Sequence, residues 1–283
     1  MRTLKRTRRT FSSNKRLALA ATSLVLSSLL GTAISMRASH SNATASALAT
    51  YEILHSFTGN AGYGFNGDTD GANPYGPLIQ APDGNFYGTT VNGSATATAP
   101  WGTVFKMDST GRITILHHFV LAVSGDGANP FSGLTLAGDG KFYGTTYTAS
   151  GVTGSCANGG VMFRIDSSGK YGKVFTFSGT EGGCPKAGVI QGKDGYLYGT
   201  TTRAGYDGKY VYAGTVYRAS LGGGATMLHG FTAKDGFSPT CDLLQASDGA
   251  LYGTAYGGGA SNFGTVFRLT TSSYNSPERA STN

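Results

Sequence analysis

The sequence predicts an all-β protein made of four tandem repeats, each a small antiparallel sheet, arranged as the blades of a β-propeller. An octapeptide of the type DGxFYGTT starts at Asp83, Asp139, Asp194 and Asp248, so the repeats follow one another at intervals of 56, 55 and 54 residues. A fixed period of this length marks a supersecondary unit that buries its apolar face only against its neighbours. Residues 51–270 also contain no capped apolar stripe with the 3.6-residue period of a helix.

Each repeat contains four segments with the length and composition of strands. In the first repeat they are the apolar run after Pro74, the FYGTT word (86–90), the GTVF word (102–105) and the LHxF word (116–119). Gly, Asp, Asn and Ser separate them, as between strands joined by turns. The Asp-Gly pairs favour tight turns, because glycine accepts a positive φ and aspartate bonds to nearby backbone. We therefore expect a four-stranded meander in this order, from the propeller axis outward.

The two ends of the repeat array predict how the ring closes. Tyr51–Phe57 is an outermost strand with no blade before it, and Gly264–Leu269 is a third strand with no outer strand after it. Pairing of these two segments would complete the fourth blade and remove an exposed strand edge. The prediction is a closed four-bladed ring at 50–270, followed by a polar tail at 271–283. An open array and a ring shared by two chains are the alternatives, because four blades is a low number for a propeller.

Residues 1–49 read as a signal peptide rather than a domain. This segment holds eight Lys or Arg residues and no acid, then a mild apolar run (17–34) and Ala-x-Ala cleavage options before Thr50. The pair Arg8-Arg9 fits a twin-arginine signal, with ordinary secretion as the alternative. We expect a secreted, periplasmic or extracellular protein that has no membrane insertion after cleavage.

Cleavage would also remove the positive charge of the chain. The whole sequence carries 22 basic and 15 acidic residues, a formal net charge of +7, whereas the part after residue 49 carries 14 basic and 15 acidic residues. No basic stripe remains in the mature part to bind nucleic acid, so we expect no nucleic-acid partner.

The repeated words YGTT, GTVF, LHSF and DGANP resemble the GloVer tandem repeats of exported bacterial "choice-of-anchor" proteins. The resemblance covers about residues 51–270, where four words recur in fixed order in four copies. It implies a secreted or surface-bound protein with a β-propeller-like fold and a largely undefined activity. Family members often end in an anchoring tail, whereas the residues after Leu269 are short and polar.

Three cysteines stand in the mature part, and export permits disulfides. Cys156 and Cys184 lie in loops that a meander places on the same face, so we expect a Cys156–Cys184 bridge; paired loop cysteines also occur in proteins of the resembling family. Cys241 begins an inner strand and is expected to be buried and free. Three reduced, inert cysteines are the alternative.

The acid-Gly-x-x-Pro word offers the strongest candidate site. Its acids recur four residues before the proline that leads into each inner strand: Asp70, Asp126, Glu181 and Asp235. If they ring the mouth of a central channel, four carboxylates could hold a Ca²⁺-like cation through oxygen ligands. The alternative is turn chemistry alone, with aspartate capping a turn and proline fixing the strand entry.

Two other repeated side chains have structural interpretations. His55, His117 and His229 occupy equivalent places in outer strands, which diverge around a ring, so we expect structural histidines rather than a shared metal site. A basic residue stands in every third strand, and we expect it to pair with the aspartate of an Asp-Gly turn. These bases are Lys106, Arg164, Arg218 and Arg268.

The longer loops fall on one face of the predicted propeller and carry aromatic side chains among small polar residues. Such loops, held by a rigid scaffold, are where function gathers, and aromatic platforms suit sugar rings. The candidates are Trp101, Tyr147, Tyr206 and Tyr256. We therefore expect a non-enzymatic protein that binds a glycan or a cell-surface component through this face.

Two other functions stay open. No nucleophile elbow, HExxH motif or nucleotide-binding glycine loop occurs. A polysaccharide hydrolase or lyase would need two carboxylates in different environments, and only Asp68, Asp207 and Asp242 break the symmetry of the repeat. A structural surface or matrix protein without a small ligand is the third interpretation.

Overall fold

The structure, a computed structural model, describes residues 49–59, 70–93, 101–120, 125–149, 159–203 and 213–271. All strands belong to the unit Tyr51–Asn283, and the unit Met1–Thr50 lies almost entirely outside the described residues. No helix among the described residues has the length and apolar character needed to cross a membrane.

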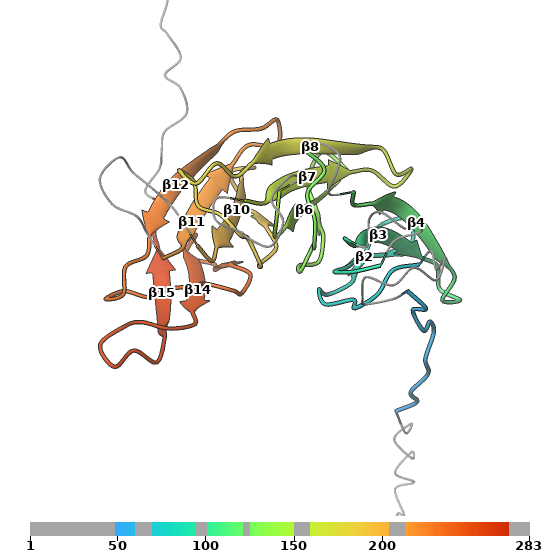
Figure 1. The fold of residues 1–283 in the computed structure, drawn as a ribbon, viewed down its shortest axis with the longest axis horizontal. Helices are drawn as coiled ribbons and strands as arrows, with labels where there is room; N and C mark the ends of the chain where they lie inside the picture. Colours follow the sequence, from blue (N-terminus) through green and yellow to red (C-terminus); the bar gives the residue numbers. More distant parts are fainter. Residues whose placement is uncertain are drawn as a thin grey trace, which may run out of the picture. The chain divides into compact units, whose positions relative to one another are not determined.

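The described residues form four antiparallel sheets (Figure 1). The first sheet contains β1 (Ile79–Gln80), β2 (Phe86–Thr90), β3 (Thr103–Met107) and β4 (Ile113–His118). The second contains β5 (Thr135–Leu136), β6 (Phe142–Thr146), β7 (Val161–Ile165) and β8 (Tyr171–Thr176). The third contains β9 (Ile190–Gln191), β10 (Leu197–Thr201), β11 (Thr215–Ala219) and β12 (Ala225–Gly230). The fourth contains β13 (Leu244–Gln245), β14 (Leu251–Ala255) and β15 (Thr265–Leu269).

Within every sheet the strands pair in chain order, so the predicted meander is confirmed. The Asp-Gly turns behave as predicted: Gly84 has φ 81° and donates its N–H to the Ala81 carbonyl at 2.9 Å. Asp83 accepts a hydrogen bond from the Asn85 N–H at 3.1 Å. The other three Asp-Gly turns repeat the positive φ at Gly140, Gly195 and Gly249.

A β-bulge recurs where the third strand meets the fourth. The register shifts between Val104 and Phe105, between Met162 and Phe163, and between Val216 and Tyr217. Each shift leaves one residue of the outer strand unpaired, which bends that strand locally. The unpaired residues pack against the apolar clusters between sheets and are Leu116, Val174 and Leu228.

The core lies between consecutive sheets rather than within any one of them. Three apolar clusters join the first sheet to the second, the second to the third and the third to the fourth. At each junction a phenylalanine that follows an outer strand packs edge-on against the third-strand ring of the next sheet. These pairs have centroid distances of 5.2 Å for Phe119–Phe163, 5.1 Å for Phe177–Tyr217 and 5.0 Å for Phe231–Phe267.

Buried threonines add polar bonds to the first two junctions. Thr89 Oγ1 donates to the Ser132 carbonyl at 2.7 Å, and Thr145 Oγ1 donates to the Ala187 carbonyl at 3.0 Å. Burying an aromatic side chain fully contributes roughly 1.5–3 kcal/mol, whereas a hydrogen bond contributes about 1 kcal/mol net. Ring packing is therefore the larger part of each junction, and the threonine bonds add a smaller polar part to the first two.

The predicted ring closure is not seen. Residues 51–57 form no strand, although Phe57 packs against Phe105 at 5.2 Å, as the phenylalanine of a preceding outer strand would. At the other end β15 pairs, among the described residues, only with β14. The side chain of Val266 on β15 is therefore 80 % exposed, whereas its counterpart Val104 on β3 is fully buried. Within the part of the chain that the structure describes, the fourth sheet thus has no outer strand, whereas the other three contain one.

Candidate functional site

The acids of the acid-Gly-x-x-Pro word close back on the outer-strand segment that precedes them in the chain. The Nε2 atoms of three histidines lie within hydrogen-bond distance of a carboxylate oxygen: His55–Asp70 at 3.0 Å, His117–Asp126 at 2.7 Å and His229–Asp235 at 2.8 Å. Glu181 belongs to the repeat without this histidine, and it accepts bonds from the N–H and hydroxyl of Ser178 at 3.2 and 2.9 Å. The histidines are thus structural, as expected, and their partners are these acids.

This geometry corrects the predicted calcium site. The four acids lie beside the outer strands because each one bonds to groups at the end of such a strand, for example Asp126 to the N–H of Val120. Among the described residues, which include all four acids, no three His, Cys, Asp or Glu side chains are grouped so as to hold a metal ion. Each carboxylate therefore caps the loop between the preceding outer-strand segment and the next inner strand.

The pKa of Asp235 shows what this capping does to the charge. Burial alone would raise this pKa, but hydrogen bonds from Thr232 and His229 outweigh burial and hold it below the ordinary value of 3.8. The pKa of Glu181 follows the same pattern, with bonds from Ser178 and Thr180 opposing burial. These carboxylates are ionised at neutral pH, and both oxygens of each already accept hydrogen bonds from neighbouring groups.

The Asp-Gly aspartates have a second partner that was not predicted from the sequence. In every sheet the aspartate accepts a hydrogen bond from the tyrosine hydroxyl of the FYGTT-type word. The four pairs are Tyr87–Asp83 at 2.6 Å, Tyr143–Asp139 at 3.0 Å, Tyr198–Asp194 at 2.6 Å and Tyr252–Asp248 at 2.8 Å. The i, i+4 spacing of Asp and Tyr in each repeat was the available signal.

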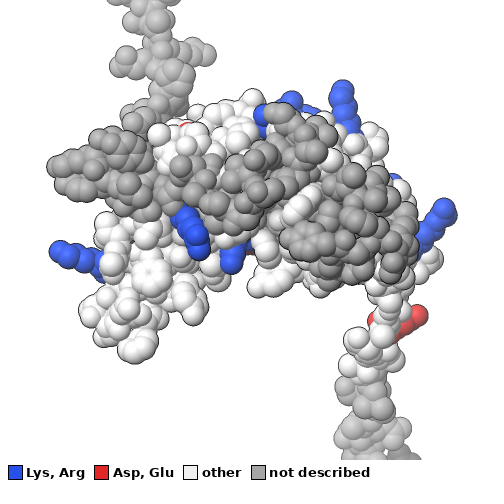
Figure 2. Space-filling model, viewed as in Figure 1, with Lys and Arg blue, Asp and Glu red and all other residues white. Residues whose placement is uncertain are grey.

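The basic residue of each third strand stands opposite this tyrosine across the sheet. The predicted ion pair with a turn aspartate is confirmed for Arg268, which lies 3.4 Å from Asp248. Arg164 instead lies 3.5 Å from the Leu221 carbonyl, and Arg218 lies over the ring of Tyr196 at 4.4 Å. On the face shown in Figure 2, the described Lys and Arg side chains are spread over the surface.

A row of side chains runs across three repeats at the residue after the proline, and we call it the aromatic row: Tyr75, Phe131 and Lys186, with Tyr147 beside them. The ring of Tyr75 lies edge-on to Phe131 at 5.7 Å, and Phe131 lies edge-on to Tyr147 at 5.3 Å. The ammonium of Lys186 lies 5.7 Å from the Phe131 centroid and 5.4 Å from the Tyr147 centroid. Tyr75 is 75 % exposed.

The aromatic row includes one residue that the sequence predicted and three that it did not. Tyr147 was a candidate, whereas Tyr75, Phe131 and Lys186 were not recognised. The signal was present, because all three directly follow the proline of the acid-Gly-x-x-Pro word in consecutive repeats. Equivalent positions of adjacent blades become neighbours, which makes a row out of single side chains.

The other predicted aromatic residues lie elsewhere. Trp101 is half-buried and packs against the cluster between the first two sheets, so its ring belongs to the core. Tyr256 is 79 % exposed and has no place in the aromatic row. Tyr206 lies outside the described residues, as do the asymmetric acids Asp68 and Asp207. Asp242 accepts a hydrogen bond from the Gly188 N–H at 2.6 Å and so links the third and fourth repeats.

The cysteines are described in part. Cys184 is fully buried, and its N–H donates to the Gly159 carbonyl at 2.7 Å. Cys156 lies outside the described residues, so the predicted Cys156–Cys184 bridge stays a prediction. Cys241 is free, as expected, but it is exposed rather than buried. The expectation of burial was wrong because the inner strand β13 begins three residues later, at Leu244, and Cys241 lies in the segment before it.

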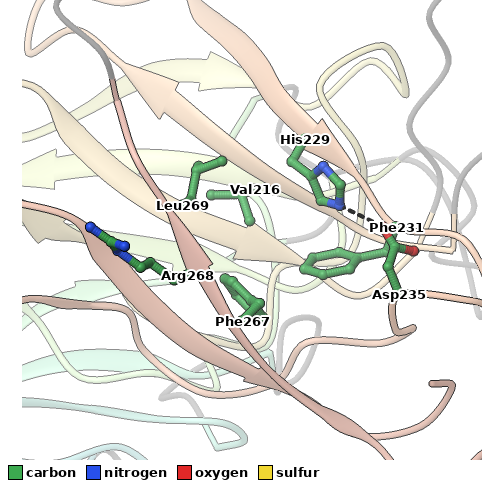
Figure 3. A pocket seen from close by; sticks show the side chains of 7 residues that line it. All are labelled: Val216, His229, Phe231, Asp235, Phe267, Arg268 and Leu269. Atoms are coloured by element: carbon green, nitrogen blue, oxygen red, sulfur yellow. Dashed lines mark hydrogen bonds and ion pairs between the residues drawn. The ribbon is translucent and has the colours of Figure 1, made fainter. Parts of the chain in front are cut away.

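A pocket of about 190 Å³ lies where the third sheet meets the fourth (Figure 3). Val216, His229, Phe231 and Asp235 line one side, and Phe267, Arg268 and Leu269 of the β15 region line the other. Its lining is mostly apolar, apart from the His229–Asp235 pair and Arg268. The pocket lies beside the strand edge that lacks an outer partner.

Comparison with known proteins places the chain in a family. The model of the Gloeobacter/Verrucomicrobia repeat matches residues 35–209 and 96–278, which together cover most of the sequence. The chain therefore belongs to the Gloeobacter/Verrucomicrobia repeat family, as the repeated words indicated. No curated protein matches the sequence.

Solved structures resemble the chain only distantly. A gluconolactonase from Xanthomonas campestris has 14 % identity and a TM-score of 0.41, over 70 % of this chain and 59 % of that one. A putative glucose dehydrogenase from Thermus thermophilus has 16 % identity and a TM-score of 0.44, over 71 % and 63 %. A protein of unknown function from Dyadobacter fermentans has 10 % identity and a TM-score of 0.47, over 73 % and 68 %. The chain spans about three fifths of the length of the first two.

Proposed function

We propose that this protein is an exported binding protein that holds an extended glycan along the aromatic row. The observation that supports this most directly is the chain of ring contacts from Tyr75 through Phe131 to Tyr147, on a surface where Tyr75 is three-quarters exposed. Large exposed aromatic side chains are not needed for the core, which the clusters between sheets already supply. A run of rings matches the apolar faces of successive sugar units.

The row also contains a cation. The ammonium of Lys186 lies close enough to two ring centroids, at 5.7 and 5.4 Å, for the ring faces to attract it. Bound there, the ammonium can also pair with a carboxylate of the ligand. We therefore propose an acidic glycan, one that carries uronic-acid units, over a neutral one. Binding of this kind does not require the four sheets to close into a ring, because the row lies within the first three repeats.

The test is retention of the mature chain (residues 50–283) in affinity electrophoresis through gels that contain a uronic-acid polysaccharide or a neutral one. Tyr75→Ala is expected to weaken retention about tenfold, because losing one ring contact of about 1.4 kcal/mol changes an affinity by that factor. Tyr256→Ala is the matched control, since Tyr256 is similarly exposed but outside the row. Failure of the wild-type chain to be retained by any polysaccharide in a broad panel would exclude the proposed function.

A further inference from the structure

The two ends of the sheet array carry complementary halves of the junction that joins every pair of neighbouring sheets. We propose that they join a second copy of this chain head to tail: residues 51–57 of one copy add to the open edge of β15 in the other. The occupant of that edge is thus an outer strand of known sequence, YEILHSF.

The first support is the pocket beside β15 in Figure 3. At the junction of the first two sheets, the equivalent space is filled by Tyr171, the first residue of the outer strand β8. Tyr171 stacks on His117 with centroids 3.9 Å apart and planes 7° apart, and its hydroxyl donates to the Asp126 carbonyl at 2.8 Å. The residue of YEILHSF that aligns with Tyr171 is Tyr51. Tyr51 is 89 % exposed, and the pocket beside His229 and Asp235 is where its ring would lie.

The second support is charge. In the second sheet Arg164 of the third strand stands opposite Gly172 of the outer strand, one residue after Tyr171. The same register would place Arg268 of β15 opposite Glu52 of the incoming segment. The other two third-strand bases face threonines, Thr114 and Thr226. The chain therefore provides an acid opposite a base at the one junction whose two strands come from opposite ends of the sequence.

The third support is that each end exposes groups which the inner junctions bury or pair. Thr89 and Thr145 donate to the next sheet, whereas the equivalent Thr254 of the last sheet is exposed. The Oε1 of Gln191 accepts from the Gly138 N–H at 2.8 Å and that of Gln245 from the Lys193 N–H at 2.9 Å, across two consecutive junctions. The equivalent Gln80 of the first sheet is exposed, and no described sheet precedes it from which its side chain could accept.

A second copy satisfies both ends at once. Within one chain, residues 51–57 already pack on the first sheet through Phe57 and His55, in the manner of a preceding outer strand. Their other edge is left for a β15, and the chain's own β15 pairs with β14 alone among the described strands. The two surfaces in contact differ, so the contact is heterologous. Two copies that each place residues 51–57 against the other's β15 form a closed dimer. A copy that makes this contact at one end only leaves its other end open, and longer chains follow.

The test is charge reversal followed by mixing, read by native mass spectrometry and light scattering on the mature chain. The wild-type chain is expected to associate, and Glu52→Arg and Arg268→Glu are each expected to weaken association at least tenfold by placing like charges opposite each other. Mixing the two variants should restore association. The Glu52→Arg side chain of one variant then faces the Arg268→Glu side chain of the other, so opposite charges meet again. Lys106→Glu is the matched control, since its cross-strand neighbour is Thr114.

The mixing step separates a second copy from closure within one chain. If the chain closed its own ring, the wild type would be a monomer, and only the double variant in one chain would recover stability. That result would overturn the proposal. So would an associated wild type whose mass is unchanged by both charge reversals, because association would then use another surface. Circular dichroism of each variant shows whether it is folded, and Tyr51→Ala provides a second disruption that leaves the Arg268–Asp248 pair intact.

Discussion

Tyr171 stacks face to face on His117, with ring centroids 3.9 Å apart and an interplanar angle of 7°. The two residues lie on the outer strands of adjacent sheets, and the Tyr171 hydroxyl donates to the Asp126 carbonyl at 2.8 Å. Asp126 in turn lies 2.7 Å from His117. These three residues thus close a small network across the junction, where burial raises the pKa of Tyr171 well above its ordinary value. The network makes the junction specific as well as apolar.

Truncation of this tyrosine should weaken the junction strongly. Tyr171→Ala is expected to lower the free energy of unfolding by about 3 kcal/mol, because removal of this partly buried ring, packed between two sheets, leaves a cavity. Tyr171→Phe keeps the ring and should cost about 1 kcal/mol for the lost hydrogen bond. Urea denaturation followed by circular dichroism measures both. Equal losses for the two variants would show that the stacking contributes little.

The strands could be predicted from the sequence because their signals are local. The FYGTT word with its Asp-Gly turn contains its own alternation and its own hairpin chemistry, and β2 pairs as expected. The position of Asp126 could not be found in this way. Its distance from Pro130 along the chain is fixed, but the loop turns back to the outer strand, where His117 and the Val120 N–H bind the carboxylate. That contact depends on a tertiary path.

The aromatic row also could not be predicted from local sequence signals. Tyr75 and Phe131 are 56 residues apart in the sequence and in different repeats, yet their rings touch. Only the packing of adjacent sheets brings them together. The repeat period made such a contact predictable in principle, because residues at one offset form rows across blades. Ring closure was inferred from the order of the strand words alone, which gives the partners of a junction but not whether they belong to one chain.

A buried hydroxyl offers a stabilising substitution. Tyr217 is fully buried and its hydroxyl has no hydrogen-bond partner among the described residues. The equivalent residue is phenylalanine in the other three repeats. Because burial of an unpaired hydroxyl costs free energy, Tyr217→Phe is expected to raise the free energy of unfolding by about 1 kcal/mol. The reciprocal control is Phe163→Tyr, which should lower it, and thermal denaturation of both variants tests the argument.

Alkaline pH should destabilise the sheets through the Tyr–Asp pairs. Burial, then the bond to Asp139, raises the pKa of Tyr143 from 10.0 to about 12. Burial and the bond to Asp194 do the same for the pKa of Tyr198, also to about 12. A pKa raised by folding gives stability that is complete below the unfolded pKa and lost as the pH rises through the folded one. We therefore expect the urea midpoint to be constant below about pH 9 and to fall between about pH 10 and 12.

Asp139→Asn is the variant that checks the alkaline prediction. It removes the carboxylate charge beside Tyr143 and so should make the fall in the urea midpoint shallower. The variant also loses the exposed Lys141–Asp139 pair at 2.9 Å, which contributes little at any pH. A fall of unchanged size in the variant would mean that another group governs the alkaline transition.

The predicted disulfide can be tested by mass. The N–H of Cys184 donates to the Gly159 carbonyl, and Cys156 lies three residues before Gly159 in the sequence. We expect residues 50–283, produced under oxidising conditions, to weigh less by two hydrogen atoms before reduction than after it. Peptide mapping should join Cys156 to Cys184 and leave exposed Cys241 open to alkylation. Alkylation of all three cysteines without reduction would contradict this prediction.

Lys186 should decide between acidic and neutral glycans. Its side chain is exposed beside Phe131 and Tyr147, so the ammonium can reach a ligand carboxylate without disturbing the core. Lys186→Gln is expected to weaken retention by a uronic-acid polysaccharide about two- to fivefold, the value of an exposed ion pair. Retention by a neutral polysaccharide should not change. Added salt should reproduce the effect of the substitution in the wild-type chain, because salt screens exposed charges.

Lys170→Gln, at another exposed lysine in the turn before β8, is the control. Equal loss on acidic and neutral polysaccharides would mean that Lys186 only orders the rings, and the ligand would then be recognised by its apolar face alone.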